Sequence, residues 1–343
     1  MNLIPSLFTI LCAIGYAENA ALPFYPQHEE STVKIDASYL LWQLSQDELI
    51  IATDNYYIPA TTSPSQGQSY GPLFPFQNGF QLTMRVQPDS ANPIEWAVIF
   101  SWLAPEKKPS TSKNTGIDTF PIFSVDPQMP VPNRTQFLYD HYSWFKNHYA
   151  LLDFEYKRPT QLIPSFILSP SVGLRTTWQQ QIWYSNELMF TVNPISSDYI
   201  YDFTQNFWGI GPKIGMNGTF YFFRNIRWIN PLTLVFKSAF STICAPTTVK
   251  INYSSKTATS HLTFYDSAMR IFPIIPVIDL SVGINYTFND PFSTPFLQQI
   301  DINLLWETQT WIGLNRMLSS YPLYLTPSTL TIQGLSVGLG VTF

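Results

Sequence analysis

Apolar side chains occupy every second position at the end of this chain. Leu335, Val337, Leu339, Val341 and Phe343 alternate with residues that are small or polar, and the chain ends on the aromatic residue. Because successive side chains of a β-strand point to opposite faces, this pattern predicts a strand with one apolar face and one face of small polar groups. The wall of a transmembrane β-barrel requires this alternation, since one face meets lipid and the other faces the lumen.

The same two-residue period recurs along the chain and predicts about ten strands. Segment 33–53 is either one long strand or a hairpin that turns at 45–47. If a hairpin within one of the loops joined the wall, the count would rise to twelve. The segments with this period are 33–53, 79–87, 94–102, 147–156, 165–184, 207–223, 228–241, 277–288, 297–311 and 329–343.

Long and short connections alternate between these segments. The long ones are 55–77, 104–146, 186–204, 243–275 and 313–328, and the short ones are 88–93, 157–164, 224–227 and 289–296. Outer-membrane barrels have long extracellular loops and short periplasmic turns, so both ends of an even-stranded barrel would lie on the periplasmic side. A soluble β-sandwich has no reason to alternate its loop lengths in this way. The sequence therefore predicts an all-β fold, an antiparallel transmembrane β-barrel in the outer membrane of a Gram-negative bacterium.

The composition agrees with a membrane barrel. Charged residues make up 12% of the chain, whereas a soluble domain has about 25%. Aromatic residues make up 16%, which fits the aromatic girdles at membrane interfaces. Beyond the N-terminus no apolar run reaches about 18 residues, which excludes helical membrane spans. The net charge of −5 argues against nucleic acid as a partner.

The N-terminal segment resembles a secretory signal. Residues 3–17 are mostly apolar and end in the small Ala17, although the usual positive charge before the apolar run is absent. The predicted division is a signal peptide at 1–17, a periplasmic segment at 18–32 and an outer-membrane barrel at 33–343. Cleavage would remove Cys12 and leave Cys244 without an internal partner, so we expect no intrachain disulfide.

Charged side chains recur on the polar faces of the predicted strands. A lysine or arginine on the lipid face would cost about 2–4 kcal/mol at the membrane midplane, so these groups are expected to face the lumen. Two interpretations follow: a pore whose field sets ion preference, or charges that pair across a filled barrel through which nothing passes. With eight acids and five bases, the set leans weakly towards cations. The predicted pore-lining residues are Lys34, Asp36, Arg85, Glu95, Asp153, Glu155, Arg175, Glu187, Lys213, Lys237, Asp279, Asp301 and Glu307.

The sequence shows no catalytic centre, cofactor motif or metal-ligand spacing. Asp153 and Glu155 could form an acid–base pair, but basic partners such as Arg175 explain them better. His141 and His148 could belong to the site of an outer-membrane lipase, yet no serine stands in a Gly-x-Ser-x-Gly setting. We therefore expect a protein that is not an enzyme and that needs no cofactor or metal.

Several stretches resemble the pore-forming outer membrane proteins related to the chlamydial major outer membrane protein, which occur in chlamydia-like and legionella-type bacteria. They are VKIDASYLLW (33–42), PSVGLR (170–175), FWGIGPKIGMN (207–217), WETQTW (306–311) and LTIQGL (330–335), of which the third is the most specific. The resemblance implies a surface-exposed general porin without catalytic residues. Cysteine usage departs from the family pattern, because chlamydial relatives are cysteine-rich and cross-linked.

The function expected from the sequence is a porin through which small hydrophilic solutes diffuse. The alternative is a surface scaffold or adhesin that acts through its long loops, and a barrel enzyme that uses His141 or His148 is a third possibility. The expected partners are outer-membrane lipid and, through the C-terminal strand, the barrel-assembly machinery. A homo-oligomer is compatible with the sequence, although no stretch shows a subunit interface.

Overall fold

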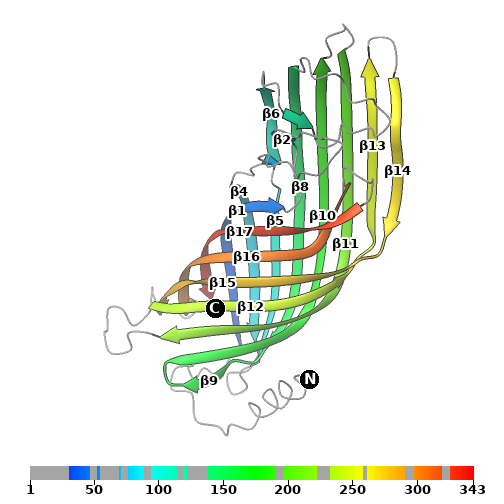
Figure 1. Ribbon diagram of the computed structural model, residues 1–343. Coiled ribbons are helices and arrows are strands. Elements are labelled where there is room, and N and C mark those ends of the chain that lie inside the picture. The colour runs from blue at the N-terminus through cyan, green and yellow to red at the C-terminus, as the bar shows by residue number, and fades with distance from the viewer. Residues whose placement is uncertain are drawn as a thin grey trace, which may run out of the picture.

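The computed structural model of this chain is an antiparallel β-barrel (Figure 1). It describes residues 31–46, 52–54, 69–70, 76–88, 94–104, 106–114, 119–121, 138–190, 196–221, 232–257, 261–289, 297–318 and 325–343. Ten of its strands form the wall: β1 (Thr32–Gln46), β4 (Gln77–Gln87), β5 (Glu95–Leu103), β8 (Leu138–Lys157), β10 (Phe166–Phe190), β11 (Ser196–Tyr221), β12 (Leu232–Cys244), β15 (Ile274–Asn289), β16 (Gln299–Leu318) and β17 (Leu325–Thr342). The predicted fold class and strand number are confirmed.

Each wall strand pairs with the next in chain order, and the last strand pairs with the first. The closing pair of β1 and β17 runs in register from Lys34 opposite Thr342 to Gln46 opposite Leu330. In lipid no water is available for unpaired backbone groups, so a spanning sheet must close on itself. Closure leaves every wall strand with two neighbours, as a membrane barrel needs.

The two ends of the barrel differ. The start of β1 and the end of β17 lie at the same end of the barrel, which we call the turn end. We call the opposite end the loop end. At the turn end the backbone N–H of Val33 donates to the carbonyl of Phe343 at 3.3 Å, and the N–H of Phe343 donates to the carbonyl of Val33 at 2.9 Å. The short strand β9 (Thr160–Ile163) also lies at this end, where it pairs with the beginning of β10.

One side of the wall rises well beyond the loop end (Figure 1). Strands β8, β10 and β11 continue past the rim, and β13 (Thr247–Thr257) and β14 (His261–Ile271) extend the same sheet. Strand β11 pairs with β13 over Ser197–Phe207 and with β12 from Ile210 onwards. The breaks between β12 and β13 and between β14 and β15 contain Pro246 and Pro273, which suits a residue that has no N–H to donate to a ladder.

The structure corrects several predicted loops. Segments 186–204 and 243–275 are mostly strand, because they form the risen part of the wall. Much of 313–328 is also strand, since β16 runs to Leu318 and β17 begins at Leu325. Segment 104–146 contains β6 (Glu106–Asn114), the start of β8, and β7 (Thr119–Pro121). Strand β7 forms a small separate sheet with β2 (Ala52–Asp54) and β3 (Ser69–Tyr70).

The two faces of the wall follow the predicted alternation. Val172, Leu174, Ile214 and Leu339 point outward and are 51–58% exposed, as lipid-facing side chains would be. Towards the end of the C-terminal strand, two inward positions are glycine for a steric reason. A side chain on Gly338 would collide with Ser38 and Asn303, and one on Gly340 would collide with the carboxylate of Asp36. These glycines therefore make room for polar side chains from both neighbouring strands.

The N-terminal predictions concern residues that the structure hardly describes. The predicted signal peptide at 1–17 and nearly all of the segment at 18–32 lie outside the described residues, so both stay predictions. Within the described residues, Cys244 is a free cysteine with an exposed side chain. No helix among those residues is long and apolar enough to cross a membrane.

Candidate functional site

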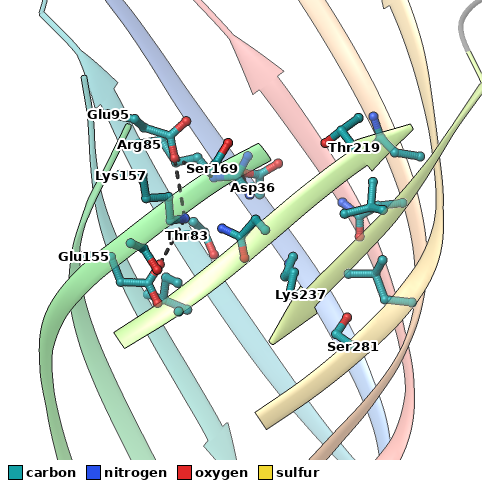
Figure 2. A pocket seen from close by; sticks show the side chains of 18 of the residues that line it. Asp36, Thr83, Arg85, Glu95, Glu155, Lys157, Ser169, Thr219, Lys237 and Ser281 are labelled. Atoms are coloured by element: carbon teal, nitrogen blue, oxygen red, sulfur yellow. Dashed lines mark ion pairs between the residues drawn. The ribbon is translucent and has the colours of Figure 1, made fainter. Parts of the chain in front are cut away.

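The half of the lumen towards the turn end contains a cavity of about 1110 Å³. All ten wall strands contribute to its lining, and the lining includes Thr32 at the start of β1 and Asn289 at the end of β15. The cavity therefore reaches the turn end of the barrel. We call it the charged chamber, because its lining contains most of the charged side chains of the wall (Figure 2).

The charged chamber gathers twelve of the thirteen residues predicted to line a pore. They are Lys34, Asp36, Arg85, Glu95, Asp153, Glu155, Arg175, Lys213, Lys237, Asp279, Asp301 and Glu307. The exception is Glu187, which lies on the risen part of β10, where its backbone pairs with Tyr199 and His141. The structure thus places the twelve residues around one internal space, while their role in a pore stays a prediction.

Ion pairs join eleven side chains of the charged chamber into a single unbranched series. Acids and bases alternate along it, and each base links two acids. The order is Asp301, Lys34, Asp36, Arg85, Glu95, Lys157, Glu155, Lys213, Asp153, Arg175 and Asp279. Apart from the Lys34–Asp301 pair, the nitrogen–oxygen distances are 2.6–3.9 Å. Figure 2 shows the part of the series from Glu95 to Glu155.

Arg175 is the most deeply buried base of this series, with 1% of its side chain exposed. Its Nε and Nη2 atoms both donate to the carboxylate of Asp153 at 2.8 Å, and Nη1 donates to Ser241 Oγ at 3.3 Å. Nη2 also lies 2.6 Å from Asp279 on β15, three strands away around the barrel. A planar guanidinium suits such a site, because its fixed fork binds a carboxylate through two parallel hydrogen bonds.

The lumen towards the loop end is filled by apolar side chains, which we call the apolar layer. They come from eight wall strands and are at most 2% exposed. Their members are Leu40, Trp42, Leu44, Leu103, Tyr149, Leu151, Phe207, Ile243, Ile275, Val277, Trp311, Leu314, Leu330 and Ile332. The same buried cluster continues onto the inner face of the risen wall through Trp183, Tyr201 and Phe203.

Contacts in the apolar layer span the barrel. Tyr149 on β8 and Trp311 on β16 belong to strands half a circumference apart, yet their ring centroids are 5.8 Å apart in an edge-to-face contact. Phe207 meets Trp311 in the same manner at 6.3 Å. The hydroxyl of Tyr149 donates to Gln309 Oε1 at 2.6 Å. Because these groups are packed together and buried, the layer closes the lumen in this conformation.

Two features of the lumen were missed in the sequence. The sequence pattern places Lys157 in a short connection, although it continues the inward parity of Asp153 and Glu155 and pairs with Glu155 at 3.0 Å. The sequence does not reveal the apolar layer directly, because its hydrophobic residues lie on strand faces that are identified as inward by their charged and polar residues. Leu40 and Trp42 share the parity of Lys34 and Asp36, so the same alternation could have placed them in the lumen.

The residues considered for catalysis are not assembled into a site within the described part of the chain. The predicted pairing of Asp153 with Arg175 is present, so this carboxylate is an ion-pair partner. His148 stacks on Trp178 with 6.3 Å between ring centroids. The backbone of His141 lies on the risen part of β8, opposite Ser112 and Glu187. Among the described residues no three of His, Cys, Asp and Glu are placed to hold a metal ion.

Solved structures similar to the chain include outer membrane proteins of low sequence identity. The outer membrane protease OmpT from Escherichia coli matches with a TM-score of 0.46 and 10% identity, over 94% of this chain and 100% of that one. A Pseudomonas aeruginosa FadL homologue matches with a TM-score of 0.28 and 10% identity, over 92% and 90% of the two chains. Ail, the attachment invasion locus protein of Yersinia pestis, matches with a TM-score of 0.23 and 10% identity, over 92% and 99%.

Comparison with curated protein sequences finds no match. A comparison with family models finds one that matches residues 25–343, which is nearly the whole chain. Its description is "Legionella pneumophila major outer membrane protein precursor".

Proposed function

Because the chain belongs to the family of the Legionella pneumophila major outer membrane protein, we propose that it is a pore-forming barrel that admits small hydrophilic solutes and ions. The charged chamber is the observation that supports this proposal, since a cavity of about 1110 Å³ with a charged lining suits hydrated solutes. The protein is an outer membrane barrel of this family. The conduction of solutes through it is the part that we propose. On this proposal the protein acts as a channel and not as an enzyme.

The apolar layer sets the condition for passage. Ions lose their hydration shell in an apolar constriction, so such a layer blocks current until it is wetted. We propose that the layer is the closed gate of this pore and that solutes cross when its side chains separate. The charged chamber then admits solute from the turn end, and the layer decides whether solute leaves at the loop end.

The second candidate function is a closed barrel that serves as a surface scaffold. The apolar layer favours this function, because a barrel whose lumen is permanently filled by packed side chains does not conduct. The risen wall of β8, β10, β11, β13 and β14 would then present the functional surface (Figure 1). The two candidates differ in one respect, which is whether removing the layer is enough to create a pore.

Planar-bilayer recordings of the refolded protein test the proposal. For the wild type we expect rare, brief current steps, because the layer is closed in its resting conformation. The double variant Tyr149→Ala/Phe207→Ala removes two aromatic side chains from the layer and should give lasting steps. Lasting steps from the wild type would show that the layer is no gate. If neither protein gives current, although both are inserted in the bilayer and are shown by heat modifiability to be folded, the scaffold function is favoured.

A further inference from the structure

Two charged side chains of the charged chamber lie outside the ion-pair series. Lys237 on β12 and Glu307 on β16 line the cavity, but neither takes part in the ion pairs found among the described residues. Both flank Ser281 on β15, which is directly opposite Lys237 on one side and Glu307 on the other. The three residues therefore form one row across three neighbouring strands, with a positive group at one end and a negative group at the other.

The row contains buried polar atoms that lack partners. Glu307 is only 9% exposed, and its Oε2 atom has no hydrogen-bond partner. The hydroxyl of Ser281 between the two charges is also buried and unpaired. A buried carboxylate oxygen without a partner carries the full cost of its desolvation, so such atoms call for a ligand or ordered water. In the ion-pair series each base contacts two acids, so the unpartnered atoms of Asp36, Arg85 and Asp279 there belong to groups whose charge is already paired. Glu307 has no such ion pair among the described residues.

The strongest charged neighbour of each end is the group at the other end, although Lys237 and Glu307 form no ion pair among the described residues. Weaker like charges also act on both ends, Arg85 and Lys157 on Lys237 and Asp279 on Glu307. In Figure 2, Lys237 and Ser281 lie apart from the ion-paired group of Glu95, Arg85, Lys157 and Glu155. A negative group placed beside Lys237 would meet a positive field, and a positive group placed beside Glu307 would meet a negative one.

We propose that the row of Lys237, Ser281 and Glu307 is a binding site for a small zwitterion of the amino-acid type. The ligand carboxylate binds the ammonium of Lys237, the ligand ammonium binds the carboxylate of Glu307, and the Ser281 hydroxyl donates to the carboxylate or accepts from the ammonium. Such a ligand satisfies both unpaired charges without changing the net charge of the chamber. An ion of one sign would satisfy only one end of the row.

This site adds a substrate class to the proposed function. Whether the bound solute then crosses the membrane rests on that proposed function. In a pore, the site would select amino-acid-like solutes among those that enter the chamber. Binding does not require passage, because the chamber reaches the turn end below the apolar layer. If the protein binds the zwitterion but gives no current in any bilayer recording, the proposed site is supported and the proposed pore is contradicted.

Calorimetric titration of the refolded full-length barrel tests the site. The probes are glycine, β-alanine and γ-aminobutyrate, with butylamine and butyrate as ligands of a single charge. We expect at least one zwitterion to bind at least tenfold more tightly than either single-charge ligand. Equal binding of butyrate or butylamine, or no binding of any zwitterion to the folded wild type, would overturn the proposal.

Variants assign the two ends of the row. Lys237→Met and Glu307→Gln should each weaken zwitterion binding at least tenfold, whereas the reversed pair Lys237→Glu/Glu307→Lys should recover it. Lys250→Met is the matched control, because Lys250 is an exposed lysine on β13 outside the chamber. Heat modifiability shows that each variant is folded. Unchanged affinity in both single variants, or failure of the folded reversed pair to bind, would contradict the assignment.

Discussion

The two halves of the lumen are built on the same strands with the same alternation, yet they contain opposite chemistry. On β8 the inward side chains pass from Tyr149 and Leu151 at the loop end to Asp153 and Glu155 towards the turn end. The first pair lies in the apolar layer and the second in the ion-pair series. Alternation therefore decides which face of a strand is inside, while the residue type along that face decides what the interior can do.

The difference between the halves has an energetic consequence. In the apolar layer, stability comes from packing of side chains that touch across the barrel. In the charged chamber, each side chain is stable only while its partners remain, because a buried charge without a partner is costly. Variants in the two halves should thus differ in what they disturb: packing and closure in one, charge balance in the other.

The largest effect on stability within the chamber should come from Arg175→Met. The change leaves Asp153 without its bidentate partner and Asp279 without its contact, at a site where Arg175 is 1% exposed. Breaking a buried ion pair in this way costs about 3–5 kcal/mol. Urea unfolding of the barrel from lipid vesicles measures the loss. Arg158→Met is the control, because Arg158 is exposed in the connection to β9 and should change the unfolding free energy by less than about 0.5 kcal/mol.

A smaller effect is expected at Glu95, in the more open part of the same series. Glu95 is 24% exposed and lies 3.9 Å from Arg85 and 3.5 Å from Lys157. Pairs that water can reach contribute about 0.2–1 kcal/mol, so Glu95→Gln should lower the unfolding free energy by no more than that. The same urea experiment at low and high salt provides the check, since salt should reduce the small effect further. A loss as large as that of Arg175→Met would show that the chamber is uniformly buried.

Much of this architecture could be predicted from local sequence, because a lipid-facing strand must alternate. The C-terminal strand and the inward charges such as Arg175 and Asp301 follow directly from that rule. The risen wall could not be predicted in this way. On β13 its outward face has Lys250 and Asn252 in place of apolar side chains, as a segment beyond the membrane can have, so the rule for lipid-facing strands does not identify it as a strand.

The interior arrangement depends on which strands face one another. Nothing in the local pattern relates Tyr149 to Trp311, because they are far apart in the chain and meet only after the barrel closes. The same holds for the ion-pair series, which joins residues from eight strands and pairs Lys34 with Asp301 and Arg175 with Asp279. Strand alternation gives the set of inward residues, while closure and register give their partners.

The central claim is that the apolar layer, and not the charged chamber, closes the lumen. Single-molecule conductance of two matched variants on β16 tests it most directly: Trp311→Ala, whose side chain is fully buried in the layer, and Trp306→Ala, whose side chain points outward and is 45% exposed. We predict lasting current steps from Trp311→Ala and only rare, brief steps, as in the wild type, from Trp306→Ala. Equal currents from the two folded variants, or none from Trp311→Ala, would contradict the claim.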